Sequence, residues 1–271
     1  MAKQSRANGY MKKQLVVNQK GGIGKTTLCR QQTFYTHELG YRVLAADLDP
    51  QGNFTRTMLQ VRERNGLPPA GEVMTAAHLF METPPDLPLL WCDDGLALLP
   101  STPELLDIPT LGLQVIGRPR KILEHIESRN QFDFMITDIG PARLAMMKAI
   151  LQAVDFVVCP FDIDQDAIDG LHTLMHDIRE AQTVLGNPTL KMLGGLASLI
   201  NTDRVFEVRS VEELKQAMGD IIIPPVLYDR AATKYAKDYP VWQSSKGISK
   251  SKAATEMRNV CEYLLTRMME Q

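Results

Sequence analysis

Cysteine is scarce in this sequence, and long apolar runs are absent. The four cysteines, Cys29, Cys92, Cys159 and Cys261, lie far apart and form no CxxC pair. Cys159 lies in an apolar run and Cys29 follows a glycine-rich loop, so both are expected to be small buried thiols. We therefore expect a protein without structural disulfides in a reducing, cytosolic compartment. Because no run of about 18 apolar residues occurs, the sequence predicts no membrane-spanning helix.

Charge of one sign is not in excess, and internal repeats and low-complexity segments are also missing. The chain holds 30 Lys and Arg against 32 Asp and Glu, a net charge of −2, so any nucleic-acid binding must come from a local patch. The N-terminus carries basic residues and no acid, but it lacks the apolar stretch of a signal peptide. We expect residues 1–13 to form a frayed basic tail and residues 14–271 to form a single domain.

Short apolar runs alternate with longer helical patterns along the chain. The expected strands are residues 14–18, 42–46, 96–99, 132–137, 154–159, 192–200 and 221–226. The expected helices are residues 26–39, 116–129, 144–152, 166–185, 211–218 and 252–269. Two proline-rich segments, 67–69 and 83–88, are expected to be loops around a short helix rather than an interdomain linker. This alternation predicts an α/β fold with a mostly parallel sheet and helices on both faces.

The most informative motif is a glycine-rich loop between the first expected strand and the first expected helix. It consists of Lys20, Gly21, Gly22, Ile23, Gly24, Lys25, Thr26 and Thr27. Glycines let the backbone turn tightly and point several N–H groups at one phosphate, and the start of the following helix adds partial positive charge. Lys25 can reach the β- and γ-phosphates, and the Thr26 hydroxyl can ligate Mg²⁺. The motif in this context predicts a P-loop NTPase.

One position departs from the general GxxxxGK[ST] pattern. Gln19 stands where the first glycine is expected, and Lys20 opens the glycine run instead. This KGGxGKT form resembles the deviant Walker A box of the ParA/MinD superfamily, closest to ParA-type (Soj-like) partition ATPases without an N-terminal helix-turn-helix domain. The resemblance implies an ATP-dependent sandwich homodimer in which Lys20 reaches the partner's phosphates. A cation supplied in trans stabilises charge on the γ-phosphate only after dimerisation, so the two events become coupled.

Two acidic segments resemble further boxes of the same superfamily. Residues 47–53 read DLDPQGN and begin where an expected strand ends, at the edge of the sheet where ligands of open α/β sheets bind. By resemblance, Asp49 orients the attacking water and Asp47 supports the Mg²⁺ shell. A second apolar strand ends at Asp138, which by resemblance to a Walker B strand holds Mg²⁺ through water. The family usually continues with a Pro-Pro pair, whereas this chain continues with Ile139, Gly140 and Pro141.

The resemblance also covers the adenine side of the site. It runs from about residue 14 to residue 265 and is weakest between residues 56 and 94. By analogy, Asn201 contacts adenine at the end of an expected strand, and Pro224 or Pro225 packs on the base. An asparagine at a strand end also fits a simple turn former.

The charge of the C-terminal part of the chain helps to choose between the branches of the superfamily. Residues 228–258 hold 7 basic and 3 acidic side chains, a local charge of 7 − 3 = +4. In ParA proteins the corresponding region contributes to nonspecific DNA binding, so Arg230, Lys246 and Lys250 are candidate contacts to phosphate. The alternative is a solvated surface whose lysines serve solubility.

Two other branches fit less well. The last expected helix has an apolar stripe accompanied by acids, which is typical of core packing rather than of a membrane anchor. Cys92 and Cys159 do not match the paired cysteines of the iron–sulfur branch.

Taken together, the motifs predict an ATPase with ATP and Mg²⁺ as cofactors. We expect it to segregate plasmid or chromosomal DNA with a ParB-like adaptor, in the cytoplasm of a bacterium and associated with the nucleoid. Two alternatives stay open. One is a relative that positions another cargo, such as a protein cluster, or a MinD-like spatial regulator. The other is a regulatory or scaffold protein with a vestigial ATPase, against which the intact Lys20, Lys25, Asp49 and Asp138 argue.

Overall fold

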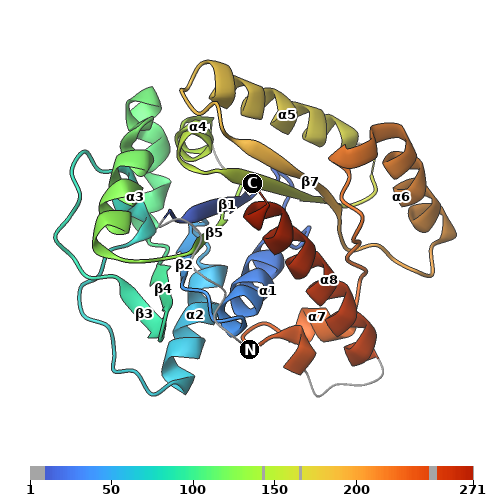
Figure 1. The fold of residues 1–271 in the computed structure, drawn as a ribbon, viewed down its shortest axis with the longest axis horizontal. Coiled ribbons are helices and arrows are strands. Elements are labelled where there is room, and N and C mark those ends of the chain that lie inside the picture. The colour runs from blue at the N-terminus through green and yellow to red at the C-terminus, as the bar shows by residue number, and fades with distance from the viewer. Residues whose placement is uncertain (1–9, 142–143, 165–166, 244–248, 271) are drawn as a thin grey trace.

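A seven-stranded sheet forms the centre of the molecule in the computed structural model, which describes residues 10–141, 144–164, 167–243 and 249–270 (Figure 1). The strands are β1 (Lys12–Val16), β2 (Val43–Asp47), β3 (Leu90–Asp93), β4 (Leu96–Leu99), β5 (Phe134–Asp138), β6 (Phe156–Phe161) and β7 (Lys191–Ala197). Their order is β3-β4-β2-β5-β1-β6-β7. Every pair is parallel except the edge hairpin β3–β4. The predicted α/β fold with a mostly parallel sheet is confirmed.

Helices cover both faces of this sheet. They are α1 (Lys25–Glu38), α2 (Asn53–Arg64), α3 (Arg118–Arg129), α4 (Leu144–Ala153), α5 (Ala167–Thr183), α6 (Val205–Met218), α7 (Ala231–Tyr235) and α8 (Ser249–Met269). Short 3-10 helices are η1 (Ala76–Phe80), η2 (Pro103–Leu106), η3 (Ile108–Val115), η4 (Gly219–Ile221) and η5 (Val241–Gln243). In Figure 1, α3, α4 and α5 lie above the sheet, and α1, α2 and α8 lie below it.

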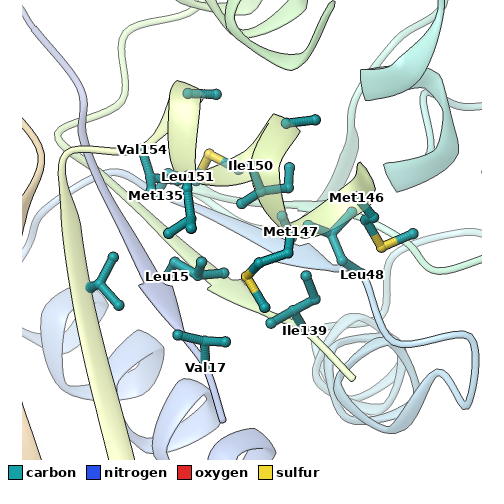
Figure 2. Packing of buried hydrophobic residues seen from close by; sticks show 14 of the residues in the cluster. Leu15, Val17, Leu48, Met135, Ile139, Met146, Met147, Ile150, Leu151 and Val154 are labelled. Atoms are coloured by element: carbon teal, nitrogen blue, oxygen red, sulfur yellow. The ribbon is translucent and has the colours of Figure 1, made fainter. Parts of the chain in front are cut away.

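Successive residues of the central strands face opposite layers, so both faces must be apolar. Leu15 and Val17 join the core beneath α3, α4 and α5. Val16, between them, joins the core with α1, α2 and α8. Figure 2 shows the upper layer, where Met147 and Ile150 of α4 pack over the sheet. This double cover explains why the strands read as continuous apolar runs rather than as alternating patterns.

Several expected elements differ from the observed ones. No strand covers residues 221–226, which form the end of η4 and a single parallel bridge from Ile222 to Gly195. Pro224 and Pro225 follow, and a residue without an N–H group cannot extend a hydrogen-bonded ladder. Strand β7 ends at Ala197 rather than at residue 200, and α6 begins at Val205 rather than at residue 211. Helix α2 and strand β3 lie where the sequence predicted no regular structure.

The first and last described segments of the chain pack into the domain. Strand β1 begins at Lys12, inside the segment expected to be a tail, and Lys13 is buried with its ammonium 2.8 Å from Glu127 Oε1. The apolar stripe of α8 is in the core, as the packing interpretation predicted, with Met257 and Leu264 fully buried. All four cysteines are free and buried. Within the described residues, no helix is long and apolar enough to cross a bilayer.

Candidate nucleotide-binding site

Three neighbouring strands end at one edge of the sheet and bring the predicted motifs together. Strand β5 pairs with both β1 and β2, and its last residue, Asp138, lies beside Val16 of β1 and Asp47 of β2. The glycine-rich loop follows β1, and the segment with Asp49 follows β2. Residues far apart in the sequence therefore share the carboxyl edge, where open α/β sheets bind their ligands.

The glycine-rich loop has the backbone conformation that its glycines permit. Gly22 and Gly24 have φ values of 79° and 90°, in the left-handed region that favours glycine. Helix α1 starts directly after Gly24, so its unpaired N–H groups face the loop. The Ser198 hydroxyl donates a hydrogen bond to the Ile23 carbonyl at 2.9 Å and ties the loop to the end of β7. Ser198 belongs to no motif and was not predicted as a site residue.

Lys25 is folded back into this loop. Its ammonium donates a hydrogen bond to the Lys20 carbonyl oxygen at 2.7 Å, and the side chain is largely buried. Burial lowers the pKa of Lys25, while Asp138 and Asp49 nearby act in the opposite direction. The cation therefore lies in the curve of the loop that was predicted to hold phosphate.

Asp138 is a buried carboxylate without a donor. The residue is 1% exposed, and among the described residues neither of its carboxylate oxygens has a hydrogen-bond partner. Burial raises the pKa of Asp138 to about 7, the charge of Asp47 adds to this, and the Thr26 hydroxyl nearby opposes it. Burying an unpaired charge is unfavourable, so a site of this kind fits a cation bound between Asp138 and Thr26.

Asp47 has its oxygens occupied by the backbone that follows it. Oδ2 accepts hydrogen bonds from the Thr55 N–H at 2.7 Å and the Thr55 hydroxyl at 2.8 Å, and Oδ1 accepts one from the Asp49 N–H at 3.1 Å. Burial raises the pKa of Asp47 to about 6 against the opposing effect of these bonds. Because Thr55 lies in the first turn of α2, Asp47 caps that helix and anchors the loop before it. Its support of a metal shell stays a prediction.

Asp49 lies in the loop that Asp47 anchors. The Ser101 hydroxyl donates a hydrogen bond to the Asp49 carbonyl at 2.6 Å, and the Ser101 N–H donates to the Thr55 hydroxyl at 2.8 Å. The Asp49 carboxylate lies directly against Gly140. Ser101 follows β4 at the same edge of the sheet, just beyond the strand expected at residues 96–99. Thr55 was not singled out at all.

Lys20 lies on the other side of the loop, next to the end of β6. Its half-exposed ammonium is 2.6 Å from Asp162 Oδ2 and also contacts Asp164. The hydrogen bonds to Asp162 and Asp164 raise the pKa of Lys20. A cavity of about 420 Å³ opens beside these three residues, with Phe161 and Leu174 on its apolar wall.

The residues predicted for the adenine side lie after β7. The Asn201 side-chain oxygen accepts a hydrogen bond from the Asp203 N–H at 2.9 Å, as a turn former does. Pro224 is exposed and Pro225 half-buried, and their segment is tied to β7 by hydrogen bonds from the Ile223 and Leu227 N–H groups. Their contacts with a base stay a prediction.

Two basic side chains of the C-terminal segment are held in ion pairs. Arg230 donates hydrogen bonds to the carboxylate of Glu256, from Nη2 at 2.8 Å and from Nε at 3.2 and 3.3 Å. Lys234 forms an ion pair with Asp229. Lys246 lies outside the described residues. Lys250 lies in α8, and its side chain is not among those described.

Known proteins resemble this chain over nearly its whole length. The AAA-domain family matches residues 11–192, more than half of the chain. The protein IncC of Escherichia coli is 30% identical, over 96% of this chain and 71% of that protein. The chromosome-partitioning ATPase Soj of Thermus thermophilus is 28% identical, over 94% of this chain and 96% of Soj.

A solved structure with a bound nucleotide analogue and magnesium also resembles this chain. Cobyrinic acid a,c-diamide synthase of Mycobacterium smegmatis, with an ATP analogue and magnesium, superposes with a TM-score of 0.73 at 26% identity, covering 94% of each chain. The shared fold, the glycine-rich loop with its leading lysine and the sequence matches agree. The chain belongs to the ParA/Soj family of partition ATPases.

Proposed function

We propose that this ATPase binds MgATP at the glycine-rich loop, dimerises around it and uses slow hydrolysis to segregate plasmid or chromosomal DNA. The observation that carries the proposal is the meeting, at one sheet edge, of the Lys25 loop, the donor-free carboxylate of Asp138 and the exposed lysine Lys20. A ParB-like adaptor stimulates hydrolysis, and the protein acts in the bacterial cytoplasm at the nucleoid.

The proposed roles divide among these residues. Residues 21–27 hold the phosphates, Asn201 and Pro224 or Pro225 hold adenine, and Thr26 and Asp138 hold the metal with support from Asp47. When bound, the metal neutralises charge on the phosphates. Asp49 orients the attacking water, and Lys20 of one subunit stabilises charge on the nucleotide of its partner.

Exposed apolar side chains support dimerisation on this face. Leu106 in η2, Leu113 in η3 and Leu144 at the start of α4 are each more than 60% exposed. Elements η2 and α4 follow the carboxyl ends of β4 and β5, and η3 contacts both of them. An exposed apolar patch on an otherwise ordinary surface is typical of a protein interface.

Nonspecific DNA binding rests on the local charge of +4 in residues 228–258 and on the partitioning relative. The pairing of Arg230 with Glu256 leaves less free charge there and gives Lys246 and Lys250 the larger share of the proposed contacts. The same pairing favours the second candidate, in which this ATPase positions a cargo other than DNA. The first candidate requires that the ATP dimer binds DNA, whereas the second does not.

A salt titration of DNA binding with ATP and with ADP tests this requirement. We expect the ATP form to bind DNA of any sequence, with affinity falling steeply as salt rises, and the ADP form to bind weakly. Replacing Arg230, Lys246 and Lys250 by alanine lowers affinity and leaves ATP binding intact. The matched control replaces three exposed cations elsewhere, Arg129, Lys191 and Arg209. Equal effects of both triple variants, or equal binding in both nucleotide states, would contradict partition through this segment.

A further inference from the structure

The side chain of Asn18 continues the contact between β1 and β6 beyond the end of β1. Directly after the last paired residue, Val16, the Val17 N–H donates to the Val158 carbonyl at 3.0 Å. Two residues further along β6, the Pro160 carbonyl accepts a hydrogen bond from Asn18 Nδ2 at 2.9 Å. Because carbonyl groups on one side of a strand recur every two residues, this side-chain amide takes the place of a main-chain donor. The chain can therefore turn into the glycine-rich loop and stay connected to β6.

The same amide holds the main chain of Lys20. Asn18 Oδ1 accepts a hydrogen bond from the Lys20 N–H at 2.9 Å. The amide oxygen can only accept and the amide nitrogen can only donate, so the two contacts together fix the orientation of the Asn18 side chain. On its other side, the Lys20 carbonyl accepts the hydrogen bond from the Lys25 ammonium at 2.7 Å. The main chain of Lys20 is thus held both before and after its Cα atom.

The side chain of Lys20 returns to the segment that Asn18 holds. Its ammonium is 2.6 Å from Asp162 Oδ2, two residues beyond Pro160, and also contacts Asp164. The lysine stem is flexible, and this side chain is 44% exposed. The ammonium can therefore leave these carboxylates by rotation within the side chain, while the main chain stays where Asn18 fixes it.

We propose that Asn18 is a positioning residue for Lys20: it fixes the main-chain position from which Lys20 reaches the partner's nucleotide. When the phosphates take up Lys25, as proposed above, the bond from Lys25 to the Lys20 carbonyl is lost, and Asn18 continues to hold the Lys20 N–H. Asn18 touches no reacting atom in this proposal and acts only through Lys20. The proposal rests on the proposed role of Lys20 in trans.

The test is a double-mutant cycle between Asn18→Ala and Lys20→Ala. In the otherwise wild-type protein we expect Asn18→Ala to lower kcat by about tenfold, less than the roughly 10²-fold that a misplacement of about 1 Å causes, because the flexible lysine compensates in part. ATP affinity should stay unchanged within a factor of about two. In the Lys20→Ala background, Asn18→Ala should cause no further loss of turnover.

A second variant separates the two hydrogen bonds of the amide. Asn18→Ser keeps an oxygen that can accept from the Lys20 N–H, as serine does in turns, but its side chain is too short to replace the bond to the Pro160 carbonyl. Because the proposal needs the connection to β6, we expect Asn18→Ser to lose most of the turnover that Asn18→Ala loses.

Asn187→Ala is the matched control for lost hydrogen bonds. Asn187 is buried, and its Nδ2 donates to the Leu151 carbonyl at 2.8 Å and to the Val154 carbonyl at 2.7 Å. It lies before β7, at the edge of the sheet opposite to the glycine-rich loop. Asn187→Ala should lower Tm at least as much as Asn18→Ala does and leave kcat unchanged, measured well below both Tm values.

The outcomes that would contradict the proposal differ in meaning. A loss of kcat that persists without Lys20 would assign Asn18 to the loop as a whole, and a loss of ATP affinity would assign it to Lys25. Full turnover of Asn18→Ser would show that the bond to Pro160 is not needed. Each of these overturns the positioning role and leaves the proposed function intact. Undiminished turnover of Lys20→Ala, or no hydrolysis by the wild type, would instead contradict the proposed function itself.

Discussion

The two lysines of the glycine-rich loop lie five residues apart in opposite surroundings. Lys25 is buried, donates to a carbonyl of its own loop and has a lowered pKa. Lys20 is half-exposed, is held by the carboxylates of Asp162 and Asp164, and has a raised pKa. The Lys25 half of the site is thus arranged by local structure in the single chain. The Lys20 half is arranged by tertiary contacts with the segment after β6.

This difference bears on how each lysine meets a nucleotide. Lys25 already lies where the loop was predicted to hold phosphate. Lys20 must leave two carboxylates before it can reach a partner's phosphates, as proposed. Ion pairs at an exposed site are worth roughly 0–1 kcal/mol each, because water and salt screen them. A phosphate group with several charges can therefore replace these carboxylates. The two ion pairs favour one position of the Lys20 side chain but do not prevent it from moving to a phosphate.

The largest expected effect is at Lys25. Lys25→Ala removes a charge-assisted contact to the phosphates in both the bound and the reacting state. We expect kcat/KM for ATP to fall by about 10⁴-fold, with affinity itself reduced by about 10²-fold. Titration with a fluorescent ATP analogue and a steady-state ATPase assay measure the two parts. Unchanged ATP affinity would mean that Lys25 does not bind phosphate.

The contrast between the lysines also explains what the sequence could and could not predict. The loop residues were predictable because the motif is continuous and its neighbours are a strand and a helix. The partners of Lys20 were not, because Asp162 and Asp164 lie 142 and 144 residues away and belong to no motif. The contact between Gly140 and the Asp49 carboxylate was not predictable either, because the two residues lie in separate segments that only the folded chain brings together.

The fold was predictable to a similar degree. The central strands were found because both faces of the sheet are covered. Helix α2 was missed because its start has no local capping side chain: Gly52 precedes it, and the cap comes from Asp47 across a loop. The prediction of a strand at residues 221–226 was wrong because Pro224 and Pro225 have no N–H groups to donate to a strand ladder, although the run before them is apolar.

A smaller effect, confined to turnover, is expected at Lys20. Lys20→Ala should bind ATP with nearly wild-type affinity and lose about 10²-fold in kcat, because a cation aimed at developing charge is worth roughly this much. Light scattering should also find less ATP-dependent dimer. Undiminished turnover would remove Lys20 from the proposed mechanism and leave the contrast with Lys25 without functional meaning.

The smallest effect is expected from the carboxylates that hold Lys20. Asp162→Asn combined with Asp164→Asn should free the ammonium and raise basal turnover and ATP-dependent dimerisation by a few-fold, the equivalent of about 1 kcal/mol. Asp169→Asn is the matched control, since Asp169 lines the same cavity and is not among the residues that contact Lys20 in the described part of the chain. In a Lys20→Ala background the double substitution should change nothing. A rise that persists without Lys20, or one that Asp169→Asn reproduces, would assign the effect to the general charge of the cavity.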